Sequence, residues 1–271
     1  EINFNSISEY FTFQNILSKN TFFKNIEVFE AGSFLKYSLK NKKFTIEKYW
    51  EYNFRKKQNK KKENEYIEEL KKLHENAINS QLVSDVKVGS YLSGGIDSSS
   101  ITYIASKNIN KFDTFNCGFQ TRLISNKEKK FDETFKAKII CKYLKTKNHK
   151  FLIEPKHIEK SLNSIAYHLE EPRVGQSYPN YYASKLASKH VKVALSGIGG
   201  DEFFGGYPWR YLTGLKINNY NEFINKYYKI WQRLITEDNK KKFFSPIWGN
   251  IKTQNNKEIF KNIFKGLNKK I

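Results

Sequence analysis

The sequence predicts an α/β fold in which helices flank a parallel sheet. Two short apolar runs, residues 86–92 and 191–195, each end in a glycine-rich turn that leads into a helix. Between residues 63 and 195, apolar runs alternate with segments of helical periodicity. Strands separated by helices of this length are typical of parallel sheets. A chain of 271 residues has enough apolar material for one or two domains.

The predicted elements follow one another regularly along the chain. Residues 26–50 alternate as short strands about a turn at Asn41. Residues 63–82 are expected to form an amphipathic helix, whose apolar face comprises Ile67, Leu70, Leu73, Ala77 and Ile78. We then expect strands at 86–92, 112–119, 149–153 and 191–195, and helices at 98–108, 131–145, 156–169 and 178–190. After Asn218, aromatic side chains recur at helical spacing, which indicates helices packed into a core.

The turn after the first apolar run has the features of a phosphate site. It reads Ser93-Gly94-Gly95-Ile96-Asp97-Ser98. Backbone amides and the helix dipole favour an anion where a strand passes into a helix, and glycines allow close approach. Asp97 adds the hard oxygen ligand that Mg²⁺ prefers. No lysine follows the glycines, so this is not the common ATPase loop. A plain Gly/Ser turn is the alternative, but it leaves the strand, the aspartate and the serine run unexplained.

The turn after the second run repeats this arrangement. It reads Ser196-Gly197-Ile198-Gly199-Gly200-Asp201. On neighbouring parallel strands the two turns would face each other at the carboxyl edge of the sheet, where ligands bind in such folds. We therefore expect Asp97 and Asp201 to share one Mg²⁺ ion.

Together the two turns resemble those of a known family. The first resembles the pyrophosphate loop, Ser-Gly-Gly-x-Asp-Ser, of enzymes that split ATP between its α and β phosphates. The second, with Phe203-Phe204-Gly205-Gly206-Tyr207, resembles the signature of the asparagine synthetase (glutamine-hydrolysing) family. The likeness runs from about residue 20 to about residue 211 and is weak beyond that. It implies a pyrophosphate-loop, adenine nucleotide alpha hydrolase-like fold, preceded by the β-rich end of a glutaminase domain.

The resemblance implies a fragment of a two-domain enzyme. Residues 1–55 would be the C-terminal remnant of a glutamine amidotransferase domain, and residues 56–271 an asparagine synthetase domain that is incomplete at its C-terminal end. The sequence contains no methionine, and its two cysteines, Cys117 and Cys141, cannot supply the N-terminal nucleophile of the glutaminase. We expect the fragment itself to be inactive.

The resemblance also implies a reaction and its residues. ATP and Mg²⁺ activate the side-chain carboxylate of aspartate as an acyl-adenylate, and ammonia from glutamine then gives asparagine and AMP. The implied catalytic residues are Asp97, Asp201 and Glu170, the first two as Mg²⁺ ligands. The implied nucleotide contacts are Leu92, Ser93, Gly94, Gly95, Asp97, Ser98, Ser99, Cys117, Ser196 and Gly197.

One position departs from the family. Ile198 stands where asparagine synthetases usually carry a glutamate, and it can neither accept a proton nor bind a cation. Glu170 and Glu171 are the candidate substitutes, although the pair also reads as a helix end before Pro172. A different acceptor, whose apolar part packs on Ile198, is the other explanation. Relatives of the family also close β-lactams, cyclise peptides and amidate sugars.

Composition limits the other classes of function. The formal charge of +21 invites a nucleic-acid partner, and a pyrophosphate-loop enzyme acting on tRNA is the competing hypothesis. The excess is nearly all lysine spread along the chain, and the basic run at 55–62 reads as a linker, so we expect neither a nucleic-acid nor a membrane partner. A nucleotide-binding remnant without catalysis is a third reading.

The remaining features predict nothing further at the site. Two cysteines without close spacing give no disulfide framework or zinc site, and His149, His168 and His190 lack ligand-like neighbours. Without a signal segment or a long apolar run, a cytoplasmic location is expected, with a homodimer left open.

Overall fold

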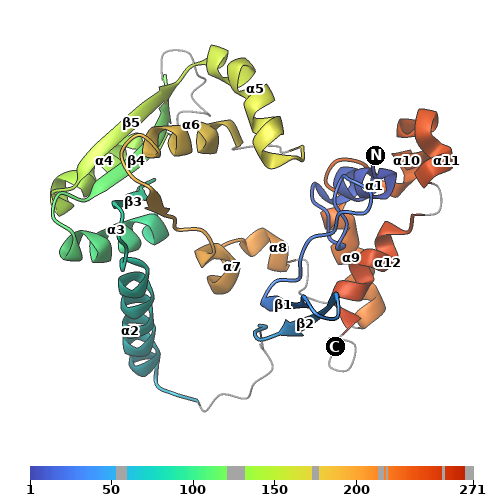
Figure 1. The fold of residues 1–271 in the computed structure, drawn as a ribbon, viewed down its shortest axis with the longest axis horizontal. Coiled ribbons are helices and arrows are strands. Elements are labelled where there is room, and N and C mark those ends of the chain that lie inside the picture. The colour runs from blue at the N-terminus through green and yellow to red at the C-terminus, as the bar shows by residue number, and fades with distance from the viewer. Residues whose placement is uncertain are drawn as a thin grey trace. The chain divides into compact units, whose positions relative to one another are not determined.

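The chain divides into two compact units. The computed structural model describes residues 1–52, 60–120, 132–172, 177–212, 217, 219–251 and 254–265. Unit 1 comprises Glu1–Asn59 and Pro208–Ile271, and unit 2 comprises Lys60–Tyr207 (Figure 1). Most of the basic run at 55–62, residue 131 and residues 173–176 lie outside the described residues.

Unit 2 is built on a four-stranded sheet in the order β5-β4-β3-β6. The strands are β3 (Val88–Tyr91), β4 (Asp113–Phe119), β5 (Lys147–Ile153) and β6 (Val193–Leu195). All pairings are parallel, with Val88 opposite Val193 and Asp113 opposite both Gly89 and Lys147. The predicted parallel sheet is confirmed, and β3 and β6, which precede the two glycine-rich turns, are neighbours.

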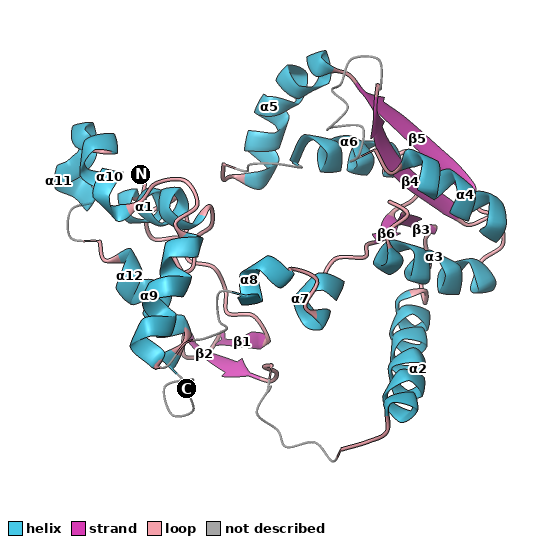
Figure 2. Ribbon diagram, turned by 180° about the vertical axis from the view of Figure 1, so that it is seen from behind, coloured by secondary structure: helices cyan, strands magenta, loops and turns pink. Residues whose placement is uncertain are grey.

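Helices cover both faces of this sheet. The helices of unit 2 are α2 (Glu63–Gln81), α3 (Ile96–Asn108), α4 (Thr134–Leu144), α5 (Pro155–Leu169), α6 (Ser177–Ala187) and α7 (Gly200–Phe204), of which α3, α4 and α6 make the main contacts with the strands. Thr114 and Phe115 are adjacent on β4 and therefore point to opposite faces. The Thr114 hydroxyl contacts the Cys141 thiol of α4, whereas Phe115 packs with Ala187 of α6 (Figure 2). The sheet is thus enclosed between α4 and α6.

The predicted amphipathic helix α2 joins the core only near its end. Ile78 packs with Val88 and Leu195 in one buried cluster. Ile67, Leu70 and Leu73 stay about half exposed, at 52%, 47% and 61%. The helix is confirmed, but most of its apolar face is not covered in unit 2.

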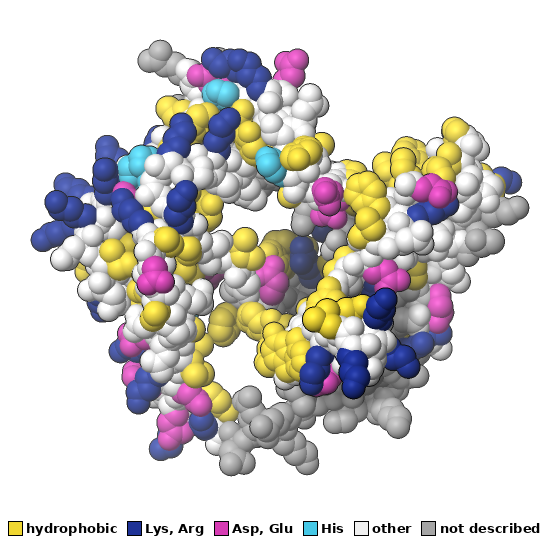
Figure 3. Space-filling view, viewed as in Figure 1, with side chains coloured by type: hydrophobic (Ala, Val, Ile, Leu, Met, Phe, Trp, Pro, Cys, Tyr) yellow, Lys and Arg dark blue, Asp and Glu magenta, His cyan; other side chains and the backbone are white. Residues whose placement is uncertain are grey.

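Lysine and arginine side chains are scattered over the surface. Figure 3 shows them in dark blue, distributed among apolar and uncharged side chains on the face in view. None of the helices among the described residues combines the length and apolar character that a membrane span requires.

Unit 1 contains one hairpin and several helices. The hairpin is β1 (Ser33–Ser38) and β2 (Lys43–Lys48). The helices are α1 (Phe4–Phe13), α8 (Pro208–Leu212), α9 (Tyr220–Trp231), α10 (Glu237–Phe243), α11 (Trp248–Ile251) and α12 (Asn256–Ile263), with a 3₁₀ turn at Ser245–Ile247. The hairpin and the helical tail agree with the sequence, whereas helix α1 was not predicted.

The hairpin presents an uncovered apolar face. Its antiparallel register sets Leu35 opposite Ile46 and Tyr37 opposite Phe44, so all four side chains share one side. Their exposed fractions lie between 48% and 62%. Because an isolated two-stranded hairpin is marginal in water, this face is suited to packing against a further layer. The assignment of residues 1–55 to a glutaminase domain stays a prediction.

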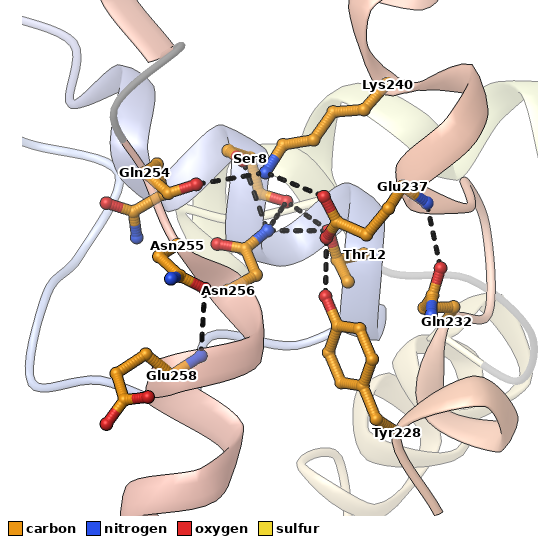
Figure 4. Close-up of polar contacts among 10 residues, drawn as sticks. All are labelled: Ser8, Thr12, Tyr228, Gln232, Glu237, Lys240, Gln254, Asn255, Asn256 and Glu258. Carbon is orange, nitrogen blue, oxygen red and sulfur yellow. Dashed lines mark hydrogen bonds and ion pairs between the residues drawn. The ribbon is translucent and has the colours of Figure 1, made fainter. Parts of the chain in front are cut away.

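A buried polar network joins the two segments of unit 1. Asn256, at the start of α12, donates hydrogen bonds to the Ser8 carbonyl and the Thr12 hydroxyl of α1, at 3.0 and 2.7 Å (Figure 4). Nearby, Lys240 bonds the Gln254 carbonyl at 3.3 Å. Around this network, Phe13 of α1 packs with Tyr228 and Phe260. Segments almost 250 residues apart therefore form one core.

Candidate active site

The first glycine-rich turn connects β3 to α3. Gly94 has φ +88°, and a Cβ there would lie 2.5 Å from the Lys136 Cβ, so only glycine fits. The Ser93 and Ser98 hydroxyls lie 3.0 Å apart, and the Ser99 hydroxyl donates to the Gly95 carbonyl at 2.6 Å. The serines therefore hold the turn in shape.

The start of α3 provides donors for an anion. Gly95 is its N-cap and supplies no side-chain cap, and the first amides of a helix have no acceptor within it. The Ser93 and Gly95 amides, in contrast, bond to the Ser98 and Ser93 hydroxyls at 3.2 Å. An anion would compete for those two amides, and the first amides of α3 have no acceptor within the helix.

The second turn packs directly on the first. A Cβ on Gly197 would lie 2.7 Å from the Ser98 nitrogen, and a Cβ on Gly200 would lie 2.4 Å from an Asp97 carboxylate oxygen. The sequence predicted that the two turns would meet, and the structure brings them together. The Asp97 carboxylate therefore lies against Gly200, the residue before Asp201.

Asp97 and Asp201 stand in the first turns of the helices that follow the two glycine-rich turns. Asp97 is partly exposed in the first turn of α3, and Asp201 is exposed in the first turn of α7. Among the described residues, no group of three or more His, Cys, Asp or Glu side chains is placed to hold a metal ion. Two carboxylates suit Mg²⁺ when phosphate oxygens and water complete its coordination. The donor set therefore fits a nucleotide-bound ion rather than a metal held by protein alone.

A pocket of about 850 Å³ opens at the carboxyl edge of the sheet. Its wall includes the predicted residues Leu92, Ser93, Cys117 and Ser196, together with Ile198. The other predicted nucleotide contacts, Gly94, Gly95, Asp97, Ser98, Ser99 and Gly197, lie in the two turns beside it and not in its wall. The size is in the range of small-molecule sites.

The wall around Cys117 is largely apolar. Phe115 and Phe119 flank it along β4, and Ile153, Pro155 and Ile158 continue the wall. Burial raises the pKa of the Cys117 thiol to about 12, so the thiol is neutral at physiological pH. Such a wall suits the flat face of a heterocyclic base.

Sequence reasoning missed the carboxylates that reach the pocket. Glu133 and Glu154 line it and precede α4 and α5, at strand-to-helix junctions like that of Asp97. Their position just before a helix that follows a strand was the signal in the sequence that could have identified them. Glu154 also caps α5 and pairs with Lys156, which holds the pKa of its carboxyl below the ordinary value. Glu170, in contrast, ends α5 with φ 54°, is exposed and does not line the pocket.

A family model and individual relatives match the chain. The model described as asparagine synthase matches residues 69–264, so the likeness extends beyond residue 211, where the motifs become weak. A putative asparagine synthetase (glutamine-hydrolyzing) 2 from Methanocaldococcus jannaschii is 35% identical over 229 residues, which cover 83% of this chain and 41% of that protein. Asparagine synthetase (glutamine-hydrolyzing) 1 from Bacillus subtilis is 32% identical over 209 residues, covering 76% and 31%. The chain spans less than half the length of either relative.

Proposed function

The chain belongs to the asparagine synthase family, and from this membership we propose that it forms the nucleotide-binding part of an ATP-dependent ligase that makes asparagine. In the whole enzyme, an oxygen of the aspartate side-chain carboxylate attacks the α-phosphorus of ATP. The bond to the β-phosphate breaks and pyrophosphate leaves. Ammonia derived from glutamine then attacks the acyl carbon, and AMP departs with the bonding electrons.

The contact between the two glycine-rich turns is the observation that carries this proposal. Gly197 and Gly200 allow the second turn to approach Asp97 and Ser98 more closely than any Cβ would permit. The joint surface lies beside the pocket at the carboxyl edge of the sheet. A nucleotide with its base in the pocket would thus extend its phosphates over both turns.

The residues of the turns then have distinct roles. Ser93, Gly94, Gly95, Ser98 and Ser99 hold the departing pyrophosphate through hydroxyls and amides. Ser196 and Gly197 set backbone groups against the ribose and the adenylate. Asp97 and Asp201 bind Mg²⁺, which neutralises charge on the phosphates. Positioning and fixed electrostatics supply most of the rate gain in such transfers.

Nucleotide binding by this chain tests the assignment. We expect calorimetry to detect weak ATP binding that strengthens with Mg²⁺, without turnover. Asp97→Asn should remove the Mg²⁺-dependent part of the affinity, because it removes a charged oxygen ligand. Asp85→Asn, at an exposed aspartate outside both turns, is the matched control. Equal Mg²⁺ dependence of the ATP affinity in wild type and Asp97→Asn would refute the proposal.

Ile198 favours a second candidate, an amide-forming ligase with another carboxylate acceptor. Its side chain lines the pocket and is 89% exposed, so an apolar acceptor group could pack on it. Glu170 remains the proposed substitute carboxylate of the first candidate, although it does not line the pocket.

The acceptor is identified with the full-length enzyme and ammonia supplied directly. Aspartate-dependent AMP and asparagine formation would be compared in wild type, Ile198→Glu and Glu170→Gln, with exposed Glu159→Gln as the control. If Glu170 substitutes, Glu170→Gln abolishes turnover and Glu159→Gln does not. Robust synthesis in Glu170→Gln refutes that role. Turnover of aspartate only after Ile198→Glu would mean that the natural enzyme has another acceptor or no activity.

A further inference from the structure

Four ionisable side chains meet near the amino ends of β4 and β5, away from the nucleotide pocket. Asp113 begins β4 and its side chain is 1% exposed. One carboxylate oxygen lies 2.6 Å from the His149 Nε2, and the other pairs with the Lys87 ammonium. Each oxygen of the carboxylate therefore faces one of these two side chains. Desolvation by burial is the largest single influence on Asp113 and raises its pKa. The hydrogen bonds and charges of Lys87 and His149 together outweigh it, so the pKa of Asp113 lies below its ordinary value.

His190 stacks on this group from a different element. It lies in the turn between α6 and β6, where its amide donates to the Ala187 carbonyl at 2.9 Å. Its ring is 3.8 Å from the His149 ring, centroid to centroid, with 28° between the planes. Phe115 completes the stack, 5.3 Å from His149 and 5.9 Å from His190.

A proton on His190 would be poorly accommodated. The ring faces His149 and Lys147 of β5, Lys87 before β3, and the carboxylate of Asp113, which is already paired. Desolvation by partial burial, followed by His149, lowers the pKa of His190, while Asp113 acts in the opposite direction. A neutral ring can be partly buried in the stack at little cost, whereas a cationic ring would be desolvated and would lie near the ammonium groups of Lys147 and Lys87.

The stack is linked to the pocket at two points. Phe115 lines the pocket and is fully buried. His190 lies shortly before β6 (Val193–Leu195), and the pocket residue Ser196 directly follows that strand. Movement of the turn that holds His190 would therefore disturb both a wall residue and the strand that leads to the second glycine-rich turn.

We propose that His190 is a proton-sensitive latch, which holds β6 and Phe115 in place while its ring is neutral and releases them when it is protonated. This property is independent of the reaction that the site catalyses. Because the pKa of His190 is lower in the folded chain than its ordinary value of 6.5, the folded chain binds fewer protons. The stability from the neutral ring is complete above about pH 6.5 and is lost as pH falls through the folded pKa.

Hydrogen–deuterium exchange of the full chain tests the latch. After correction for intrinsic rates, peptides covering residues 188–195 should exchange faster at pH 5.5 than at pH 7.5. The change should not exceed about tenfold per pH unit, the limit for uptake of one proton. His190→Phe retains an aromatic ring that cannot titrate, so its exchange in β6 should be independent of pH. His168→Gln, at an exposed histidine, is the matched control and should behave as wild type.

Two results would overturn the proposal. One is pH-dependent exchange in β6 that persists unchanged in His190→Phe. The other needs no variant and remains decisive if His190→Phe does not fold: in the wild-type chain, NMR titration should give His190 a midpoint below its ordinary value of 6.5. A midpoint at or above 6.5 would show that the stack does not disfavour the proton.

Discussion

Gly94 carries a strict steric requirement within the first turn. Its φ of +88° lies in the left-handed region, and an added Cβ would meet the Lys136 Cβ at 2.5 Å. We expect Gly94→Ala to lower the free energy of unfolding by about 1–3 kcal/mol, from backbone strain alone. Urea denaturation measures this change. Gly249→Ala, where a Cβ meets no atom within 4 Å, is the control and should stabilise α11 by about 0.5–1 kcal/mol. Equal effects of the two substitutions would contradict the steric argument.

The reactivity of the Cys117 thiol measures how well the pocket wall excludes solvent. Because burial raises the pKa of its thiol to about 12, little thiolate exists at neutral pH. We expect iodoacetamide to modify it slowly at pH 7.5, with a rate that still rises above pH 9, and ATP to slow the reaction further. A cysteine placed at exposed Ser80 should react faster at pH 7.5 and reach its limiting rate at lower pH. Similar rates at Cys117 and at Ser80→Cys would show that the wall is open to solvent.

At the scale of the element, the attachment of α12 to α1 depends on Asn256. Its side chain is 1% exposed and donates to both Ser8 and Thr12. Asn256→Ala removes two hydrogen bonds to buried acceptors, so the free energy of unfolding of unit 1 should fall by about 1–3 kcal/mol. Denaturation followed by tryptophan fluorescence measures the loss. Asn239→Ala, at an exposed position of α10, should have little effect, and an equally small loss in Asn256→Ala would refute the role of the network.

The elements of unit 2 were predictable because local pattern and tertiary environment agree there. The strands and helices after residue 63 lie within a few residues of their expected bounds. Helix α1 was missed because Phe4–Phe13 mixes aromatic, Ser and Thr residues, and its buried partners in α9 and α12 are more than 200 residues away. Packing at that distance has no local signal.

The two turns of the site were predictable because they require glycine, whereas the carboxylates that line the pocket were not predicted from the sequence. Both glycine-rich turns follow from their sequence, because few residues tolerate such backbone contacts. Glu133 and Glu154 reach the pocket because of how α4 and α5 begin, which the sequence did not reveal. Glu170 was favoured only because its segment leads along the chain to the second glycine-rich turn. The roles of all these residues stay predictions.

For the whole molecule, the charge of +21 gives a testable expectation. Lysines that are spread rather than clustered should bind duplex DNA and tRNA alike, with a Kd no tighter than about 10⁻⁶ M at physiological salt. Fluorescence anisotropy over a salt series checks this, with a steep loss of binding as salt rises. A selective tRNA complex that persists at physiological salt would instead support the tRNA-modifying hypothesis.

The pairing of α1 with α12 also sets an order of events during synthesis. Ser8 and Asn256, which share a hydrogen bond, are 248 residues apart. At about 5–20 residues per second, a ribosome needs roughly 12–50 s to make the residues between them. All residues of unit 2 are made within that interval, before α9 and α12, the helices on which Phe13 of α1 packs. Phe13 therefore gains its contacts with Tyr228 and Phe260 only after the residues of the nucleotide site have been made.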